Sequence, residues 1–254
     1  MNSFRPCVLL LLCAVLPINA QEQTSDVTPL EVPDLVLVFS KTAGYRHQSI
    51  EKGVATLRRM GRTNNFIVLQ TETADDFTID HLKNYLLVIF MSTTMNVLNE
   101  EQEAAFEAYI KGGGSFLGIH AAADTEYEWQ WYGQLVGGYF ESHPNNPNVR
   151  RAKIQVMSKE HPSTAHLVDP WIRNDEWYNF KNLNPNITVV LNLDETSYEG
   201  GTNGANHPIA WYHKFDGGRA YYTGGGHTEA SYDEPDFQQH LLGAIQWCLG
   251  STDQ

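Results

Sequence analysis

Two histidines in this sequence follow apolar runs, in surroundings that suit a catalytic side chain. The run at residues 115–119 ends at His120, and three alanines come directly after it. A sharp turn from a strand into a helix needs small neighbours, because its central residue is strained and projects into a cleft. A buried histidine with satisfied hydrogen bonds would give the same pattern, but the small residues favour a functional His120.

The second histidine, His227, follows three glycines and stands two residues before Glu229. Glycines let the backbone pass close to a ligand. Imidazole titrates near neutral pH and is the usual general acid or base, and a carboxylate can fix its tautomer. The alternative is a glycine-rich surface turn with an incidental histidine. We predict that His120, His227 and Glu229 are catalytic, with Glu229 orienting His227.

Other loops carry side chains that suit substrate binding. The loop at residues 44–49 contains an aromatic ring, a guanidinium and an imidazole, and Ser49 can cap a helix whose first amides favour a polarised oxygen. Asp175 and Glu176 are adjacent, so on a strand only one can face a site, and we predict that Glu176 does. Tryptophans could stack on sugar faces or pack in the core. The predicted substrate-binding residues are Tyr45, Arg46, His47, Asp124, His143, Glu176 and Trp177.

The first half of the chain predicts the elements that would carry these loops. Apolar runs at residues 35–39, 66–69, 85–90 and 115–119 are typical of strands buried on both faces. Helix-length segments at 49–60 and 99–111 separate them, and Asn99 and Gln102 occupy capping-box positions. The alternation predicts an α/β fold with a doubly wound, mainly parallel sheet. Ligands bind such sheets at the carboxyl ends of the strands, where the loops with His47, His120 and His227 would meet.

The pattern after residue 125 is less regular. We expect a short helix at 128–136 and strands at 151–157 and 188–193. The segments 208–212 and 219–223 flank Asp216-Gly217-Gly218, which predicts a hairpin. Apolar residues at helical spacing predict a final helix at 235–249.

The beginning of the sequence and its charge limit location and partners. Arg5, the apolar stretch at 8–16 and the small Ala20 are arranged as in a secretory signal peptide, and the stretch is too short for an ordinary membrane span. We predict a signal at 1–20, a flexible lead-in at 21–33 and one domain at 34–249, in a secreted or periplasmic protein. The formal charge of −13 disfavours nucleic acid as a partner.

Cysteine and histidine usage limits the chemistry further. Only Cys248 lies outside the predicted signal, so no internal disulfide or CxxC metal site is possible, and its apolar setting favours a packed thiol. Ten histidines in an acidic protein would suit zinc or a similar divalent ion, but no pair has HExxH spacing. We predict no cofactor and keep a divalent metal as the alternative. Asn186-Ile187-Thr188 is a glycosylation sequon of use only in a eukaryote.

A set of motifs between residues 34 and 249 resembles the trehalose-utilisation (ThuA-like) family. The motifs are Gly44-Tyr45-Arg46-His47, residues 118–125 (GIHAAADT), Gly137-Gly138-Tyr139-Phe140 with His143-Pro144, Asp175-Glu176-Trp177-Tyr178, residues 207–212 (HPIAWY) and residues 224–228 (GGGHT). The resemblance implies a flavodoxin-like domain similar to class I glutamine amidotransferases. It places His120 at their nucleophilic cysteine and matches His227 and Glu229 to their His-x-Glu pair. Without a thiol no glutamyl thioester can form, so we expect no glutaminase activity.

The same resemblance implies a small carbohydrate as the partner, a disaccharide or a 3-keto sugar. A consistent mechanism is proton abstraction beside a ketone by His120 or His227, with Arg46, His47 and backbone amides near Ala121 stabilising the enolate oxygen. Two alternatives stay open. One is a non-catalytic sugar-binding module that stacks sugars on Trp129, Trp131, Trp171, Trp177 and Trp211, and the other is a metal-dependent hydrolase.

Overall fold

The computed structural model describes residue 1 and residues 32–251. The predicted signal peptide at 1–20 and almost all of the predicted lead-in therefore lie outside the described residues. Within residues 32–251, no helix is both long enough and apolar enough to cross a membrane.

Residues 32–251 fold around one nine-stranded sheet, flanked by helices and short 3₁₀ turns. The strands are β1 (Asp34–Phe39), β2 (Phe66–Thr71), β3 (Leu87–Met91), β4 (Ser115–Ile119), β5 (Tyr139–Ser142), β6 (Val149–Val156), β7 (Trp171–Glu176), β8 (Asn179–Lys181), β9 (Thr188–Asp194), β10 (Pro208–Phe215) and β11 (Gly218–Thr223). The helices are α1 (Ser49–Thr63), α2 (Ile79–Leu82), α3 (Glu100–Lys111), α4 (Gln130–Val136) and α5 (Pro235–Cys248), and the 3₁₀ turns are η1 (Ala74–Asp76), η2 (His120–Asp124), η3 (Glu195–Ser197) and η4 (Glu229–Asp233).

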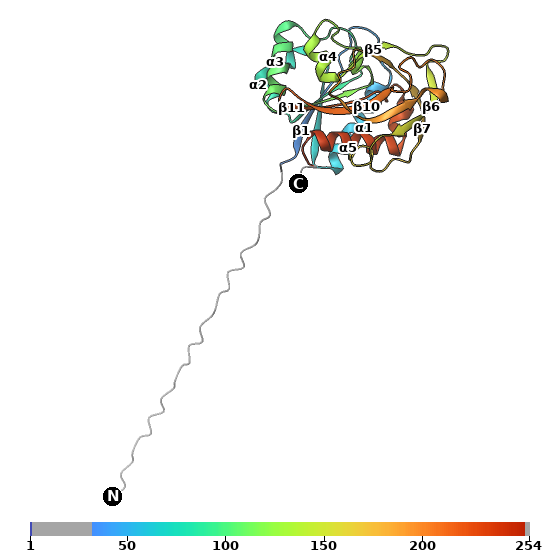
Figure 1. Ribbon diagram of the computed structural model, residues 1–254. Helices are drawn as coiled ribbons and strands as arrows, with labels where there is room; N and C mark the ends of the chain where they lie inside the picture. The colour runs from blue at the N-terminus through green and yellow to red at the C-terminus, as the bar shows by residue number, and fades with distance from the viewer. Residues whose placement is uncertain (2–31, 252–254) are drawn as a thin grey trace. The chain divides into compact units, whose positions relative to one another are not determined.

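The sheet has a parallel half and an antiparallel half. Its strand order is β2-β1-β3-β4-β11-β10-β9-β6-β7, and the pairs from β2 to β11 are parallel. The pairs from β11 to β7 are antiparallel, and β5 and β8 form a separate two-stranded sheet. Helices α1 and α5 cover one face, and α3 and α4 cover the other (Figure 1). The predicted α/β fold with a large parallel component is confirmed, whereas the antiparallel extension through β9, β6 and β7 was not expected.

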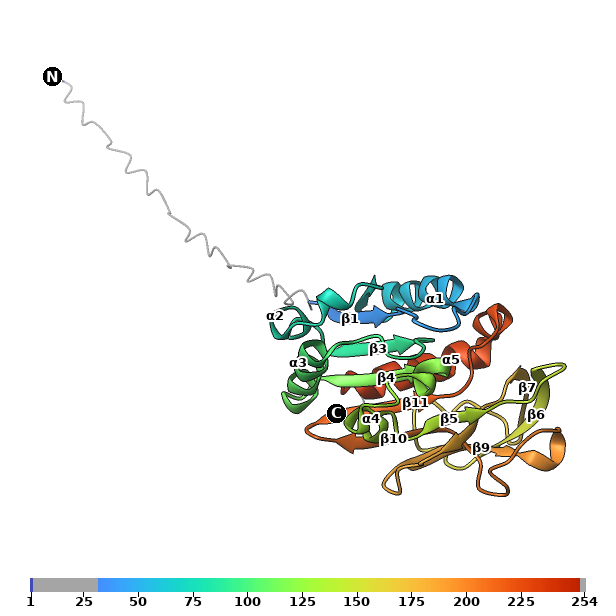
Figure 2. The same cartoon turned by 90° about the horizontal axis from the view of Figure 1, so that it is seen from above.

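The parallel strands form because their side chains are apolar on both faces. Every residue of β3 and β4 is buried, and the aromatic rings of Phe90, Phe106 and Phe116 contact one another between the sheet and α3. Continuous burial removes apolar surface on both faces of each strand from water, which is the main stabilising contribution in such a layer. In Figure 2 the arrows of β1, β3 and β4 point the same way, so the loops that follow them emerge at one edge of the sheet.

Local signals fix several boundaries at the expected places. Asn99 and Gln102 form the reciprocal capping box at the start of α3. Asp216 and Gly217 both have positive φ in the turn between β10 and β11, which confirms the predicted hairpin. The predicted helix at 128–136 is the shorter α4, and the final helix is α5.

Candidate functional site

His120 occupies a strained turn where β4 passes into η2. Its φ is +51°, in the left-handed region that non-glycine residues rarely adopt. The fully buried imidazole places Nδ1 3.0 Å from the carbonyl oxygen of Gly224, and the Tyr222 hydroxyl donates to the His120 carbonyl at 2.7 Å. A carbonyl only accepts, so Nδ1 carries a proton and donates it to Gly224. These contacts therefore stabilise the strained backbone conformation and fix the orientation of the imidazole ring.

The small residues around His120 are needed for packing. A Cβ on Gly118 would lie 3.0 Å from the Tyr222 ring and 3.1 Å from the Cβ of Ala122. A larger residue at either position would push the turn away from β11. The expectation that small neighbours allow a sharp turn here agrees with this geometry.

The backbone of the His227 loop is held by Asp175, at the end of β7. The fully buried Asp175 carboxylate accepts hydrogen bonds from the backbone N–H groups of Gly226, at 2.8 Å, and of His227, at 3.1 Å, and from the Ser231 hydroxyl at 3.0 Å. It also forms an ion pair of 3.0 Å with Arg173. The antiparallel half of the sheet thus fixes a loop that follows the parallel half.

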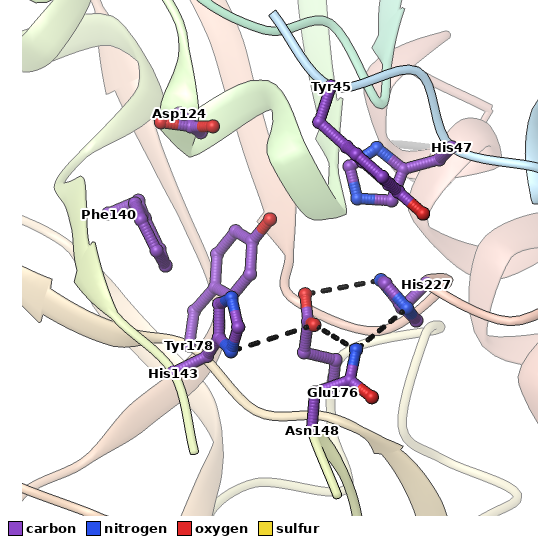
Figure 3. A pocket seen from close by; sticks show the side chains of 9 residues that line it. All are labelled: Tyr45, His47, Asp124, Phe140, His143, Asn148, Glu176, Tyr178 and His227. Atoms are coloured by element: carbon purple, nitrogen blue, oxygen red, sulfur yellow. Dashed lines mark hydrogen bonds and ion pairs between the residues drawn. The ribbon is translucent and has the colours of Figure 1, made fainter. Parts of the chain in front are cut away.

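Glu176 follows Asp175 on β7 and so faces the opposite side, where it contacts both His120 and His227; Figure 3 shows its contact with His227. Its Oε2 lies 3.1 Å from His227 Nδ1 and 3.4 Å from His120 Nε2, and those two nitrogens are 3.2 Å apart. Asn148 donates to Glu176 Oε1 at 2.6 Å and lies 3.3 Å from His227 Nε2. Two imidazoles and a carboxylate from three separate segments therefore converge on one point.

His47 completes this group just before α1. Its side chain is 3% exposed, Nδ1 is buried, and no residue in the described part of the chain forms a hydrogen bond with the ring. The ring centroid lies 4.8 Å from that of His120 and 5.1 Å from that of His227, each edge to face. Burial, with the neighbouring His120 and His227, lowers the pKa of His47 to about 2, so the ring is neutral at physiological pH.

The carboxylate of Glu176 stays ionised despite its burial. Desolvation raises the pKa of this group, but hydrogen bonding and attraction from His120 and His227 outweigh it and hold the pKa well below its usual value. The centre of the site therefore carries a negative charge surrounded by imidazole nitrogens.

The group opens into a cavity of about 290 Å³. Nine residues line it: Tyr45, His47, Asp124, Phe140, His143, Asn148, Glu176, Tyr178 and His227. Tyr45 is 64% exposed at the mouth, and Tyr178 packs against both His120 and Phe140. Asp124 accepts a hydrogen bond from Tyr127, and burial raises its pKa. A cavity of this size with aromatic and polar walls suits a small polar molecule.

Seven of the predicted site residues are brought together here. His47, Tyr45, Asp124, His143, Glu176 and His227 line the cavity, and His120 lies behind His227 and Glu176.

Three predicted site residues do not line this cavity. Glu229 is exposed at the start of η4, because Thr228 caps that turn and directs the chain to the surface, and the carboxylate that contacts His227 is Glu176 instead. Arg46 is turned outward by ion pairs with Glu51 at 2.6 Å and Glu72 at 2.8 Å.

Trp177 is the third of these, because it is buried away from the cavity. Its Nε1 donates to the carbonyl of Arg150 at 2.8 Å. None of the tryptophans among the described residues lines the cavity, and Trp211, for example, is fully buried with its Nε1 donating to Val136. The tryptophan-stacking version of a sugar-binding module therefore has no support at this site.

Three cavity residues were missed by the sequence analysis. Phe140 and Tyr178 lie within the family motifs, three residues before His143 and directly after Trp177. Asn148 gave no local signal, because its position depends on the pairing of β6 with β7, which sets Val149 opposite Glu176.

Comparison with known proteins identifies a family and a fold. The profile of the ThuA family, described as trehalose utilisation, matches residues 35–248. A ThuA-like protein from Bacteroides uniformis has a similar structure, with a TM-score of 0.74, 22% identity and coverage of 88% of this chain and 94% of that one. One from Parabacteroides merdae has a TM-score of 0.68 and 18% identity, over 86% and 91% of the two chains.

More distant structures share the fold only. A β-galactosidase from Bacillus circulans sp. alkalophilus aligns with a TM-score of 0.56 and 13% identity, over 86% of this chain but 31% of the enzyme. No functionally curated protein matches this sequence.

Proposed function

This chain belongs to the ThuA, or trehalose utilisation, family, and on that premise we propose that it is an enzyme acting on a disaccharide or a 3-keto sugar. Membership of the family indicates a carbohydrate-related role, and the imidazole and carboxylate groups of the cavity suit proton transfer. The order of the five parallel strands, β2-β1-β3-β4-β11, is that of flavodoxin-like sheets and supports the expected relation to that fold.

One observation carries the proposal. His227 and Glu176 line a cavity of small-molecule size, and His120 contacts both from behind. Paired imidazole and carboxylate groups at the wall of a cavity commonly act as general acids and bases. His227 is placed to touch the substrate, whereas the fully buried His120 acts through His227 and Glu176 as a positioning residue.

The proposed reaction on a 3-keto glycoside is an elimination. The imidazole of His227 takes the proton from C2, beside the ketone, and the C–H electron pair forms a C1–C2 double bond as the C1–O bond breaks. The departing sugar oxygen receives the proton and leaves as an alcohol, so no oxidant or reductant is needed. Glu176, 3.1 Å from His227, stabilises the imidazolium, and a positioned base of this kind contributes roughly 10²–10⁴-fold to rate.

Glutaminase activity has no support in this site. The position expected for a nucleophilic thiol holds His120, and the free cysteine among residues 32–251, Cys248, is buried in α5. Imidazole does not replace a thiol in forming a glutamyl thioester.

The test compares His227→Ala and His120→Ala with the unchanged protein on 3-keto-glucosides and on the unmodified disaccharides, with product formation followed by mass spectrometry. His81→Ala, in α2, is the control for a histidine outside the cavity. We expect turnover by the unchanged protein and the control, and a loss of at least a hundredfold in His227→Ala. Equal turnover in all four proteins would refute the role of the cluster, and calorimetric binding of sugar without any product would favour a binding protein.

A further inference from the structure

We propose that His47, His120, Glu176 and His227 bind one divalent transition-metal ion. The inference deepens the proposed function and rests on it for its chemical use, although its support and its test are independent. The donor atoms of these four side chains all lie within 4.8 Å of one another. They come from the loop before α1, the turn after β4, the end of β7 and the loop after β11, so the fold itself gathers them.

Three of the donors already have the spacing of metal ligands. His227 Nδ1, His120 Nε2 and Glu176 Oε2 form a triangle with edges of 3.1, 3.2 and 3.4 Å. Ligands of a tetrahedral zinc ion, each about 2.0–2.2 Å from the metal, lie about 3.3–3.6 Å apart. An ion just outside the plane of this triangle, at equal distance from its three corners, would therefore need little movement of the side chains.

The donor types of this triangle are those that transition metals accept. Imidazole nitrogens and carboxylate oxygens are both ligands of zinc and similar divalent ions. The Nδ1–H of His120 donates to the carbonyl of Gly224, so the ring turns its Nε2 toward Glu176 Oε2, 3.4 Å away. One divalent ion would be coordinated by all three atoms at once.

His47 supplies the second and independent observation. Its ring is 3% exposed and has no hydrogen-bond partner among the described residues, with Nδ1 fully buried. Buried polar atoms in native proteins are nearly always paired, so an unpaired imidazole nitrogen beside three other ligand atoms indicates a missing partner.

The surrounding groups are those that orient metal ligands. A ligating histidine normally donates its other N–H to a carbonyl or carboxylate, as His120 does to Gly224. His227 would ligate through Nδ1 and carry its proton on Nε2, 3.3 Å from the amide of Asn148. The same amide nitrogen donates to Glu176 Oε1 at 2.6 Å, so the His227 ring must shift away from it on binding, and the bound structure should show that movement.

The donor set selects the ion and its use. Three imidazoles and one carboxylate suit zinc, cobalt, nickel or iron, and disfavour magnesium and calcium, which prefer oxygen ligands. His227, His47 and Glu176 face the cavity, so a sugar oxygen could approach the ion and be polarised by it. The lone pairs of the imidazoles would then be occupied, and proton transfer would pass to Asp124 or His143 in the cavity wall.

The test measures metal content first and activity second. Protein purified without chelators is analysed for metals, then stripped and titrated with Zn²⁺ by calorimetry, and its Co²⁺ form is examined by visible absorption. We expect about one ion per chain, and a loss of affinity of at least tenfold in each of His47→Gln, His120→Gln, Glu176→Gln and His227→Gln. His81→Gln is the matched control, and circular dichroism verifies that each variant folds.

The possible results distinguish failure of the metal site from failure of the proposed function. No metal after purification and no calorimetric binding, or four variants that bind Zn²⁺ like the unchanged protein, would overturn the metal site. Full sugar turnover by the stripped protein would overturn the use of the metal while leaving the proposed function intact. Stoichiometric metal with no turnover of any sugar would support the metal site and refute the proposed function.

Discussion

Replacing Asp175 by Asn should destabilise the protein and displace His227. Asp175 is fully buried and accepts hydrogen bonds from Gly226, His227 and Ser231, and its second role is the ion pair with Arg173. Asparagine keeps the shape but removes the charge, and it turns one acceptor oxygen into an N–H₂ group that faces other donors.

The expected cost follows from these contacts. Removing one partner of a buried ion pair costs about 3–5 kcal/mol, because the other charge stays buried and uncompensated. Arg173 keeps its contact of 2.9 Å with Glu234, which limits that part of the loss, but at least one buried N–H or O–H donor loses its acceptor at about 1–3 kcal/mol. We therefore expect the free energy of unfolding to fall by about 3–5 kcal/mol.

Urea denaturation measures this loss. The free energy of unfolding should decrease with urea concentration by about 2–3 kcal/mol per M, so the urea concentration at half-unfolding should fall by about 1–2 M in Asp175→Asn, with little change in that slope. The double variant Arg173→Met, Asp175→Asn removes both charges and should recover part of the stability, since no unpaired charge is left.

A loss below about 1 kcal/mol in Asp175→Asn would refute this reasoning. A double variant no more stable than the single one would show that the unpaired Arg173 is not the cause. Sugar turnover should fall in both variants, because each loosens the backbone of His227, which Asp175 holds through two N–H groups.

Three further predictions follow from single residues. Burial lowers the pKa of His240 to about 3, so below about pH 6.5 only the unfolded state takes up a proton there, and the free energy of unfolding decreases as the pH falls. Between pH 7 and 5 this decrease, measured by urea denaturation, should be about 2 kcal/mol smaller in His240→Gln, and an equal decrease in both proteins would contradict the prediction. Cys248 is buried and its thiol pKa is raised, so a colorimetric thiol reagent should modify it only on unfolding, and fast labelling of native protein would show the packing to be wrong. Tyr45→Ala removes an exposed ring at the cavity mouth, so KM for the sugar should rise roughly tenfold with kcat largely kept, and an unchanged KM would remove Tyr45 from the binding surface.

The parallel half of the fold was predictable because its signals are local. Runs such as Leu87–Met91 and Ser115–Ile119 are apolar at every position apart from small or strand-end residues, as strands buried on both faces require. The turn at His120 followed from its alanine neighbours. The meeting of His47, His120 and His227 then followed from one rule, that the carboxyl ends of parallel strands share an edge of the sheet.

The rest depended on contacts between distant parts of the chain. Spacing suggested Glu229 as the partner of His227, but η4 carries Glu229 to the surface, and the register of β6 with β7 brings Glu176 into that place. The same register brings Asn148 beside Glu176. Antiparallel pairing of this kind is decided by the packing of whole strands, so a single sequence does not reveal it.

The most direct measurement of the central claim is a crystal structure of the protein soaked with a 3-keto-glucoside. We expect the sugar in the cavity, with its ring against Tyr45 and one of its oxygens about 3 Å from His227 or Glu176, or from an ion held between them. Sugar bound at another surface, or a cavity that stays empty at saturating sugar, would contradict it.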